Sequence, residues 1–255
     1  MLLRSVSKHV RDQNWVAVAL DFLIVVVGVF IGIQVANWNE ERAEGDLADR
    51  YRLQLIEDVR ADLADIEVGY RTSEWRLAAL TELLERSGAP IVDTTYLPER
   101  ELSLPRPAVA NDSITYLMNA STYTRFLDND QPAYVSLLSS GNARLIGKIK
   151  PWPCVHFYYA QHLEVQKAEE RLLLFRTELA RAQHEAGVSL AGHLSEQETL
   201  QRIASDDRLI AAMSSNRLWV FYHLVVLEEL QGQAELLLEA LEANTARCEF
   251  EDDSL

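Results

Sequence analysis

One apolar segment near the amino terminus constrains this chain more than any other feature. From Val16 to Ala36 the only strongly polar side chains are Asp21 and Gln34. Trp15 and Trp38 flank the segment, and tryptophan favours the two interfaces of a membrane. At about 1.5 Å per residue the segment forms a helix roughly 31 Å long, which matches the roughly 30 Å hydrocarbon thickness of a bilayer. We therefore predict a transmembrane helix over residues 15–38.

Membrane insertion of this helix is favourable by composition. Its Val, Ile, Leu and Phe residues together contribute about −4 to −8 kcal/mol on the insertion scale. Asp21 opposes insertion by roughly 2.5–3.5 kcal/mol at most, because it lies near one end of the segment. A cleaved signal peptide is the alternative, since the strictly apolar core, residues 22–33, is short and follows a basic stretch. Gln34 stands where cleavage after Ala36 would need a small residue, which favours an uncleaved anchor.

The basic residues around the segment predict its orientation. Arg4, Lys8 and Arg11 precede it, whereas only Arg42 and Arg50 follow closely. Because cytoplasmic flanks carry the excess of Lys and Arg, we expect residues 1–14 to form a cytoplasmic arm. Residues 39–255 then form one domain outside the cytoplasmic (inner) membrane, in the periplasm of a bacterium.

Charge and cysteine content limit the partners of this domain. A formal net charge of −15 repels nucleic acid, so we expect no nucleic-acid partner. The expected partners are the lipid bilayer and either another protein or further copies of the chain. No motif predicts a cofactor. Cys154 and Cys248 are the only cysteines, and in an oxidising compartment they could pair, although sequence spacing alone leaves this open.

The domain is predicted to be all-α. Apolar residues recur three, four or seven positions apart over residues 40–86, 154–186 and 206–246, as along the packed face of a coiled coil. Ser87-Gly88 and Pro90 should end the first of these helices. We expect the transmembrane helix to continue into an antiparallel bundle of these three long helices, with short helices over 114–120 and 132–139.

Two stretches depart from this pattern. Residues 88–111 contain Pro90, Pro98, Pro105 and Pro107, which predicts an irregular proline-rich excursion. Residues 218–227 are apolar almost all round the helix but too short to span a bilayer. They should form the centre of the bundle, and the alternative is a surface covered by a protein partner.

Two blocks of sequence, Asp21 to Glu40 and residues 134–146 with Tyr158-Tyr159, together resemble a bacterial single-pass membrane family catalogued as a domain of unknown function. In the first, Asp21 opens the apolar run and Asn37-Trp38-Asn39-Glu40 closes it. The second is residues 134–146, followed in the family by paired tyrosines that Tyr158-Tyr159 match. The chain departs from the family pattern at residues 150–154, where the family continues helically. The resemblance implies a single-pass anchor with a helical extracytoplasmic part and no assigned activity.

The anchor contains several candidate interface residues. Asn37, Trp38 and Asn39 carry amides and an indole suited to the outer headgroup region, as Trp15 is at the inner one. Asp21 either lies at the cytoplasmic interface or pairs with a cation, or relays protons, within the membrane. Gly28 and Gly32 form a Gly-xxx-Gly motif that allows two helices to approach closely.

An acid-free segment, residues 131–163, is the candidate ligand or partner patch. It combines basic and aromatic side chains in an otherwise acidic chain; they include Arg144, Lys148, Lys150, Trp152, His156, Tyr158 and Tyr159. The alternative is a crossover whose charges complement neighbouring acidic helices. Cys154 and His156 lack further ligands at suitable spacing, so no metal site is predicted.

No catalytic motif is present in the sequence, and we predict no enzyme and no catalytic residues. The predicted function is a membrane-anchored helical interaction or scaffold protein. The alternative function is a periplasmic module that senses or binds a small ligand through residues 131–163.

Overall fold

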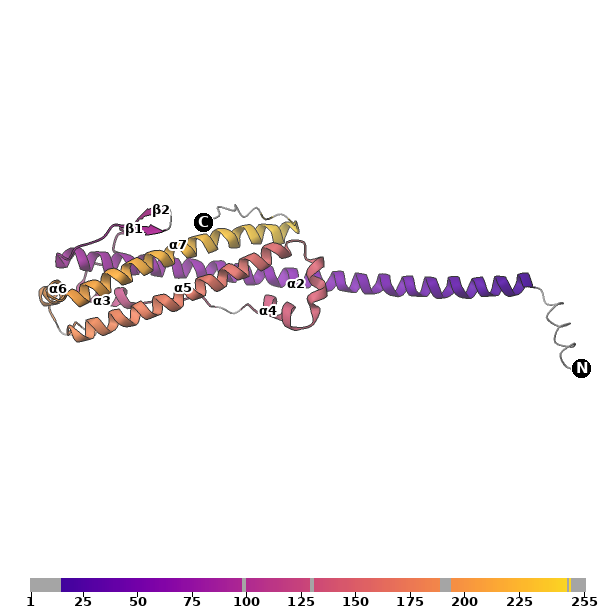
Figure 1. Ribbon diagram of the computed structural model, residues 1–255, viewed down its shortest axis with the longest axis horizontal. Helices are drawn as coiled ribbons and strands as arrows, with labels where there is room; N and C mark the ends of the chain where they lie inside the picture. The colour runs from indigo at the N-terminus through magenta and orange to yellow at the C-terminus, as the bar shows by residue number, and fades with distance from the viewer. Residues whose placement is uncertain (1–14, 98–99, 129–130, 189–193, 247, 249–255) are drawn as a thin grey trace, which may run out of the picture. The chain divides into compact units, whose positions relative to one another are not determined.

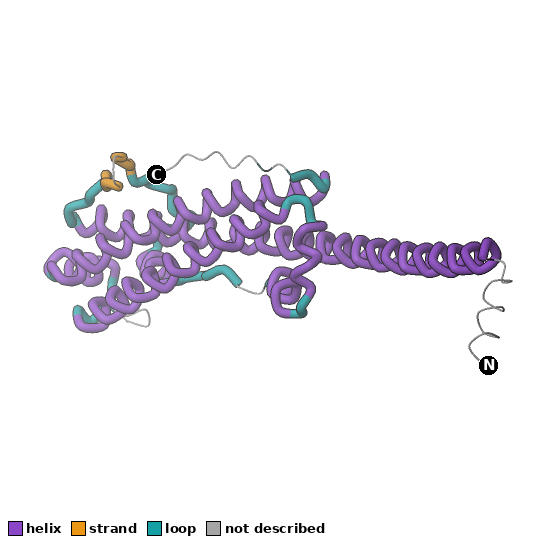
Figure 2. The backbone as a smooth tube through the Cα atoms, turned by 45° about the vertical axis from the view of Figure 1, so that its right-hand side comes forward, coloured by secondary structure: helices purple, strands orange, loops and turns teal. Residues whose placement is uncertain are grey.

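The computed structural model describes residues 15–97, 100–128, 131–188, 194–246 and 248. The described part is all-α apart from one small hairpin, which Figure 2 shows in orange. The chain divides into two compact units, residues 1–51 and 52–255. The predicted cytoplasmic arm, residues 1–14, lies outside the described residues.

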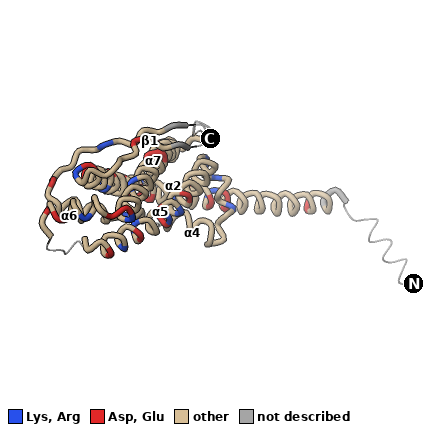
Figure 3. Tube along the Cα trace, turned by 60° about the vertical axis from the view of Figure 1, so that its left-hand side comes forward, with Lys and Arg blue, Asp and Glu red and all other residues tan. Residues whose placement is uncertain are grey.

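Helix α2, Trp15–Ser87, contains the whole predicted transmembrane segment. Every described residue from Val18 to Trp38 is exposed, including large apolar side chains such as Phe22 and Phe30. In Figure 3 this part of α2 is almost entirely tan, whereas charged positions are spread over the helices of the second unit. Within the described residues two helices are long and apolar enough to cross a membrane, this one and α7, Asp207–Ala243. The apolar window of α7 is 44% buried, as in a core helix.

The second unit is built on three long helices: the later part of α2, then α5, Trp152–Glu185, and α7. They lie side by side in Figures 1 and 2. Contacts between the helices show their relative directions. In each of the following pairs, the residue number rises along the first helix while that of its partner falls along α7, so the two helices are antiparallel. For α2 and α7 the pairs are Arg52 with Leu241, Ser73 with His223 and Thr81 with Arg217. For α5 and α7 they are Glu169 with His223, Phe175 with Trp219 and Glu185 with Arg208.

Helix α7 is therefore antiparallel to both α2 and α5, and the latter two run parallel. This arrangement requires the chain to return along the bundle between α2 and α5. The returning segment contains α3, Ile114–Thr122, α4, Pro132–Ser139, and a 3₁₀ helix, η1, Asn142–Lys148. The expected short helices are present, and α3 extends two residues beyond the predicted range.

Each long helix ends in the same local motif. Gly88, Gly187 and Asn244 have φ values of 74°, 67° and 49°, a left-handed conformation that glycine and asparagine adopt most readily. After each helix two backbone N–H groups fold back to carbonyls of its last turn, as in Ala89 N to Leu84 O at 3.0 Å. The predicted stop at residues 87–88 is confirmed.

The start of α5 and the segment before α7 add two details to the predicted helices. Helix α5 begins at Trp152, two residues before the predicted start, and Pro153 occupies its first turn, where no backbone donor is needed. An unpredicted helix, α6, Glu196–Ser205, precedes α7. Ser195 and Glu198 form a reciprocal capping box at its start. That Ser-x-x-Glu pattern was a readable signal in the sequence.

The proline-rich excursion is not wholly irregular, and this part of the prediction is wrong. It contains strands β1, Thr94–Leu97, and β2, Arg100–Ser103, paired antiparallel with Thr94 opposite Ser103. A four-residue strand carries too little periodicity to be recognised among prolines. The hairpin is held at its base by Leu104 N, which donates to Asp93 O at 2.7 Å.

The apolar stretch 218–227 lies within the bundle, but its faces differ. Val220, Phe221, Leu224 and Leu227 are buried in the core. Leu218 is exposed, whereas Trp219, Tyr222 and Val225 are half-buried. The core prediction therefore holds for one face of this stretch only.

Candidate functional site

The anchor residues share full exposure. Asp21, Asn37, Trp38 and Asn39 are all exposed, and a methyl group added at Gly28 or Gly32 would meet no described atom within 4 Å apart from the adjoining backbone of its own helix. Trp38 also stacks beneath the guanidinium of Arg42, whose Cζ lies 6.0 Å from the ring centre. Trp15 begins α2, but its side chain lies outside the described part of the structure. Residues 18–38 therefore present a wide, exposed apolar surface.

The candidate patch in residues 131–163 is split between core and surface. Tyr158 and Tyr159 are buried, whereas Arg144, Lys150 and His156 are exposed. Lys148 and Trp152 are half-buried. The basic side chains and the paired tyrosines thus do not form one continuous surface.

Most aromatic side chains of this segment pack against one another. The Tyr134 ring stacks on Tyr159 with centroids 4.1 Å apart and on Trp152 at 5.9 Å. Its hydroxyl lies 3.4 Å from Nδ1 of His156. Ala133 N donates to Asp58 of α2 at 2.9 Å. These contacts show that the segment packs on its own aromatic side chains and against α2; that its basic charges complement the acidic helices stays a prediction, which these contacts do not test.

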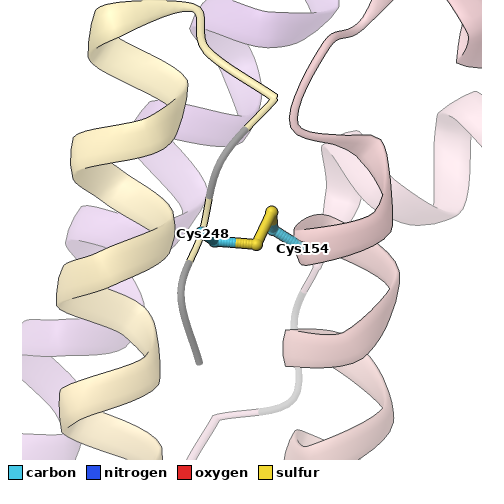
Figure 4. Close-up of a disulfide and its surroundings, with 2 residues drawn as sticks. All are labelled: Cys154 and Cys248. Atoms are coloured by element: carbon cyan, nitrogen blue, oxygen red, sulfur yellow. A yellow bond between two sulfur atoms is a disulfide. The ribbon is translucent and has the colours of Figure 1, made fainter. Parts of the chain in front are cut away.

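The structure joins the two cysteines in a disulfide. Figure 4 shows Cys154, at the start of α5, bonded to Cys248, in the segment after α7. Their Cα atoms are 6.0 Å apart and 94 positions separate them in sequence. The bond attaches the segment after α7 to the start of α5, and it closes a long covalent loop between the two cysteines.

We expect the double variant Cys154→Ser, Cys248→Ser to lose about 3 kcal/mol of unfolding free energy, because opening a long loop restores entropy to the unfolded chain. Urea unfolding of the full chain in mild detergent, followed by far-UV circular dichroism, measures this. Dithiothreitol should lower the wild-type stability by a similar amount and leave the double variant unchanged. Equal stability of oxidised and reduced wild type would contradict the prediction.

A chain of buried polar residues runs through the bundle. Ser73 Oγ lies 2.9 Å from Nδ1 of His223, and Nε2 of His223 lies 3.2 Å from Oε1 of Glu169. The same carboxylate oxygen accepts from Leu127 N at 2.9 Å. The contacts place Nε2 of His223 to donate to Glu169, and they place Nδ1 and the Ser73 hydroxyl to share a second hydrogen bond.

The order Ser–His–Glu matches that of a nucleophile, a base and an orienting acid. All three side chains, however, are at most 5% exposed, so the hydroxyl is closed to a substrate. This hydrogen-bonded Ser73–His223–Glu169 cluster, the buried relay, links α2, α5 and α7 and fixes how these helices are aligned along one another. We interpret it as structural.

Two arginines cap the end of α3 from inside the bundle. Arg76, 1% exposed, donates from Nε to Ser121 O at 3.0 Å and from Nη2 to the Asn216 amide oxygen. Arg176 donates to Thr122 O at 2.8 Å. The carbonyls at a helix carboxyl end carry partial negative charge, which offsets these cations. Burial, together with the charge of Arg176, lowers the pKa of Arg76 to about 9.

A third polar cluster surrounds Asp62, which is 6% exposed. Tyr158 donates its hydroxyl to Asp62 Oδ2 at 2.9 Å. Burial raises the pKa of Asp62 to about 7, although the Tyr158 hydrogen bond opposes the shift. Nearby, the Tyr159 hydroxyl and His162 Nε2 are buried without a hydrogen-bond partner in the described structure. Burial lowers the pKa of His162 and raises the pKa values of both tyrosines.

These buried polar residues were not predicted, although the sequence contains a signal for them. Asp62, Ser73 and Arg76 occupy helix positions on or beside the apolar stripe of α2, where a polar residue requires a buried partner. On α2 it is Asp62 that is buried, whereas the adjacent Leu63 is half-buried. Asn216 and His223 interrupt the apolar stripe of α7 in the same way. No group of three or more possible metal ligands is found among the described residues.

Comparison of the chain with protein-family models, with curated proteins and with solved structures finds no significant match. The resemblance of residues 21–40 and 134–159 to a membrane family stays a prediction.

Proposed function

We propose that this chain is a single-pass membrane protein that holds or assembles a protein partner, or further copies of itself, at the outer face of a bacterial cytoplasmic membrane. Residues 15–38 are the anchor, residues 1–14 lie in the cytoplasm, and the bundle lies in the periplasm. The observation that carries the proposal is the uninterrupted exposure of apolar side chains from Val18 to Val35. Such a surface is stable in lipid and costly in water.

Two further features support the proposed location and role. A disulfide between Cys154 and Cys248 is typical of proteins outside the cytoplasm. Gly28 and Gly32 leave a flat strip on the anchor where a second helix can approach closely. We do not propose ligand sensing through residues 131–163, because their aromatic side chains are engaged in packing.

Removing residues 1–39 should move the protein from the membrane fraction to the soluble fraction, because it removes the apolar surface that binds lipid. Carbonate-washed membranes probed by immunoblotting measure this. The control is Leu138→Ser, which removes an exposed apolar side chain of the bundle and should leave the full chain in the membrane. Intact-mass analysis of mature protein that lacks residues 1–36 would instead show a cleaved signal peptide and overturn the anchor.

Orientation and partners are tested on the intact chain. Alkaline phosphatase fused after Leu255 should be active, because it folds only outside the cytoplasm. Purification in mild detergent should recover a stoichiometric protein partner or a cross-linkable oligomer, and Gly28→Ile with Gly32→Ile should weaken self-association through the anchor. A monomer that cross-links to nothing in the membrane would contradict the interaction role.

A further inference from the structure

Two adjoining cavities lie between the hairpin and helix α7 in the second unit. One has a volume of about 240 Å³ and the other about 420 Å³. Thr95 and Leu218 line both, so the cavities meet at this pair. We refer to the two neighbouring cavities together as the hairpin groove; their volumes are of the order of the roughly 300–1,000 Å³ typical of small-ligand sites.

The smaller cavity has apolar walls on both sides. Leu102 projects from the hairpin, opposite Trp219 and Val225 of α7. Trp219 is held in place by stacking on Phe175, with centroids 5.0 Å apart. Water in such a space gains few hydrogen bonds, so an apolar ligand that displaced it would be stabilised by the apolar surface that it buries.

The larger cavity is lined by hydrogen-bonding groups as well as by leucines. Thr94 and Thr95 of the hairpin and Ser214 and Ser215 of α7 are among its lining residues. None of the four has a hydrogen-bond partner within the described residues, although serine and threonine in helices commonly bond to a preceding carbonyl. These groups are available to a polar ligand atom.

Arg217 supplies the positive charge at this end of the groove. Its guanidinium is buried and donates to Thr81 Oγ1 at 2.8 Å, to Val92 O at 2.6 Å and to Asp93 at 3.5 Å. These bonds use three of the five N–H groups. Asp93 pairs more closely with Arg106, so neutral acceptors provide most of the contacts to Arg217.

The charge of the groove differs from that of the chain. Although the net charge is −15, the described residues that line the two cavities include one cation, Arg217, and no Asp or Glu. The carboxylate next to this cation is that of Asp93, which lies 3.5 Å from the Arg217 guanidinium and pairs more closely with Arg106. A carboxylate fits the guanidinium fork and the surrounding hydroxyls.

We propose that the hairpin groove binds a single-chain amphiphile with a carboxylate head, the chemistry of a free fatty acid. The head accepts hydrogen bonds from Arg217 and from the hydroxyls of Ser214 and Ser215. The chain occupies the apolar cavity between Leu102 and Val225. That cavity is smaller than a typical whole-ligand site, so it takes one alkyl chain rather than two.

The test uses a palmitic acid analogue with a diazirine on its alkyl chain, added to the full chain in lipid nanodiscs and cross-linked by light. Mass spectrometry of the peptides should find label in residues 94–104 and 214–225 as well as in the anchor. Label in the anchor reports contact with bulk lipid and serves as an internal control. Label confined to residues 15–38 would overturn the proposal.

Variants separate the groove from non-specific labelling. Val225→Trp should fill the apolar cavity and lower groove labelling ~10-fold, equivalent to ~1.4 kcal/mol, with anchor labelling unchanged. Leu102→Trp fills it from the opposite wall and guards against misfolding of the first variant. Leu174→Trp, at an exposed position of α5, is the matched control and should have no effect. Unchanged groove labelling in both filled variants would overturn the site.

Competition by unlabelled lipids tests whether the groove recognises the carboxylate head group. Unlabelled palmitate should displace the probe ~10-fold better than its methyl ester, because the ester lacks the charge that Arg217 recognises. Equal competition by acid and ester would overturn the carboxylate assignment. This outcome is independent of membrane topology and of partner capture, so the groove and the proposed scaffold role can fail separately.

Discussion

Replacing Arg76 with methionine should lower the unfolding free energy of the bundle by about 4 kcal/mol. The change leaves the carbonyl of Ser121 and the amide oxygen of Asn216 buried without their donor, at a cost of roughly 1–3 kcal/mol each. It also removes the cation that caps α3. Urea unfolding of the full chain in mild detergent measures the loss.

The matched control for this experiment is Arg181→Met. Arg181 is exposed and pairs with Glu178 on the same helix. Such a surface pair contributes well under 1 kcal/mol, so the variant should unfold like the wild type. Equal losses in the two variants would show that the buried contacts of Arg76 do not matter.

Replacing Asp62 with asparagine should make the bundle less sensitive to pH between about 4 and 7. The folded-state pKa of Asp62 is about 7, above its value of 3.8 in an unfolded chain. The stabilisation from protonated Asp62 is therefore fully present below about pH 4. It decreases as the pH rises from there and is lost once the pH has passed the folded-state pKa of about 7. The stability of the wild type relative to Asp62→Asn should fall by about 4 kcal/mol over this range, at about 1.36 kcal/mol per pH unit.

Other titratable groups near Asp62 also contribute to the pH dependence, so the wild type and the variant must be compared at each pH. Burial raises the pKa of Asp62 most, the Tyr158 hydrogen bond lowers it, and the negative charges of Asp58, Asp65 and Asp128 raise it further. His162 affects stability with the opposite sign. Burial lowers the pKa of its imidazole, so protonating this buried ring at low pH destabilises the fold. Comparing the two proteins at each pH largely cancels this contribution.

Exposed Glu239 provides the control, since Glu239→Gln should leave the pH profile unchanged. Parallel pH profiles for wild type and Asp62→Asn would show that Asp62 keeps an ordinary pKa. Both predictions concern buried polar side chains that join helices: Asp62 links α2 to α5, and Arg76 links α2 to α3 and α7.

Local signals explain how much of the fold was predictable. Glycine or asparagine after each long helix supplies a left-handed residue, and the long apolar stripes distinguish helix from strand. The Ser195 and Glu198 capping box was equally local and could have been used. The hairpin could not be predicted in this way, because short strands are defined by their partner rather than by their own pattern.

The candidate sites were less predictable than the fold. Basic and aromatic residues are close together in the sequence of residues 131–163. In the structure, however, Tyr158 and Tyr159 are buried in the core, whereas Arg144 and Lys150 are exposed. The buried relay joins Ser73, Glu169 and His223, which lie 54 to 150 positions apart in pairs. Such pairing depends on the directions of the helices, which no local pattern encodes.

The sequence by itself determined the apolar amino-terminal helix, the all-α class and the ends of the long helices. These follow from residue volume, periodicity and backbone preference over a few turns of chain. Only the tertiary structure decided which polar groups are buried together, how the two cysteines meet and where the hairpin opens a groove over α7. Each of these requires residues remote in sequence to be brought close, and their energies depend on burial that exists only after the helices pack.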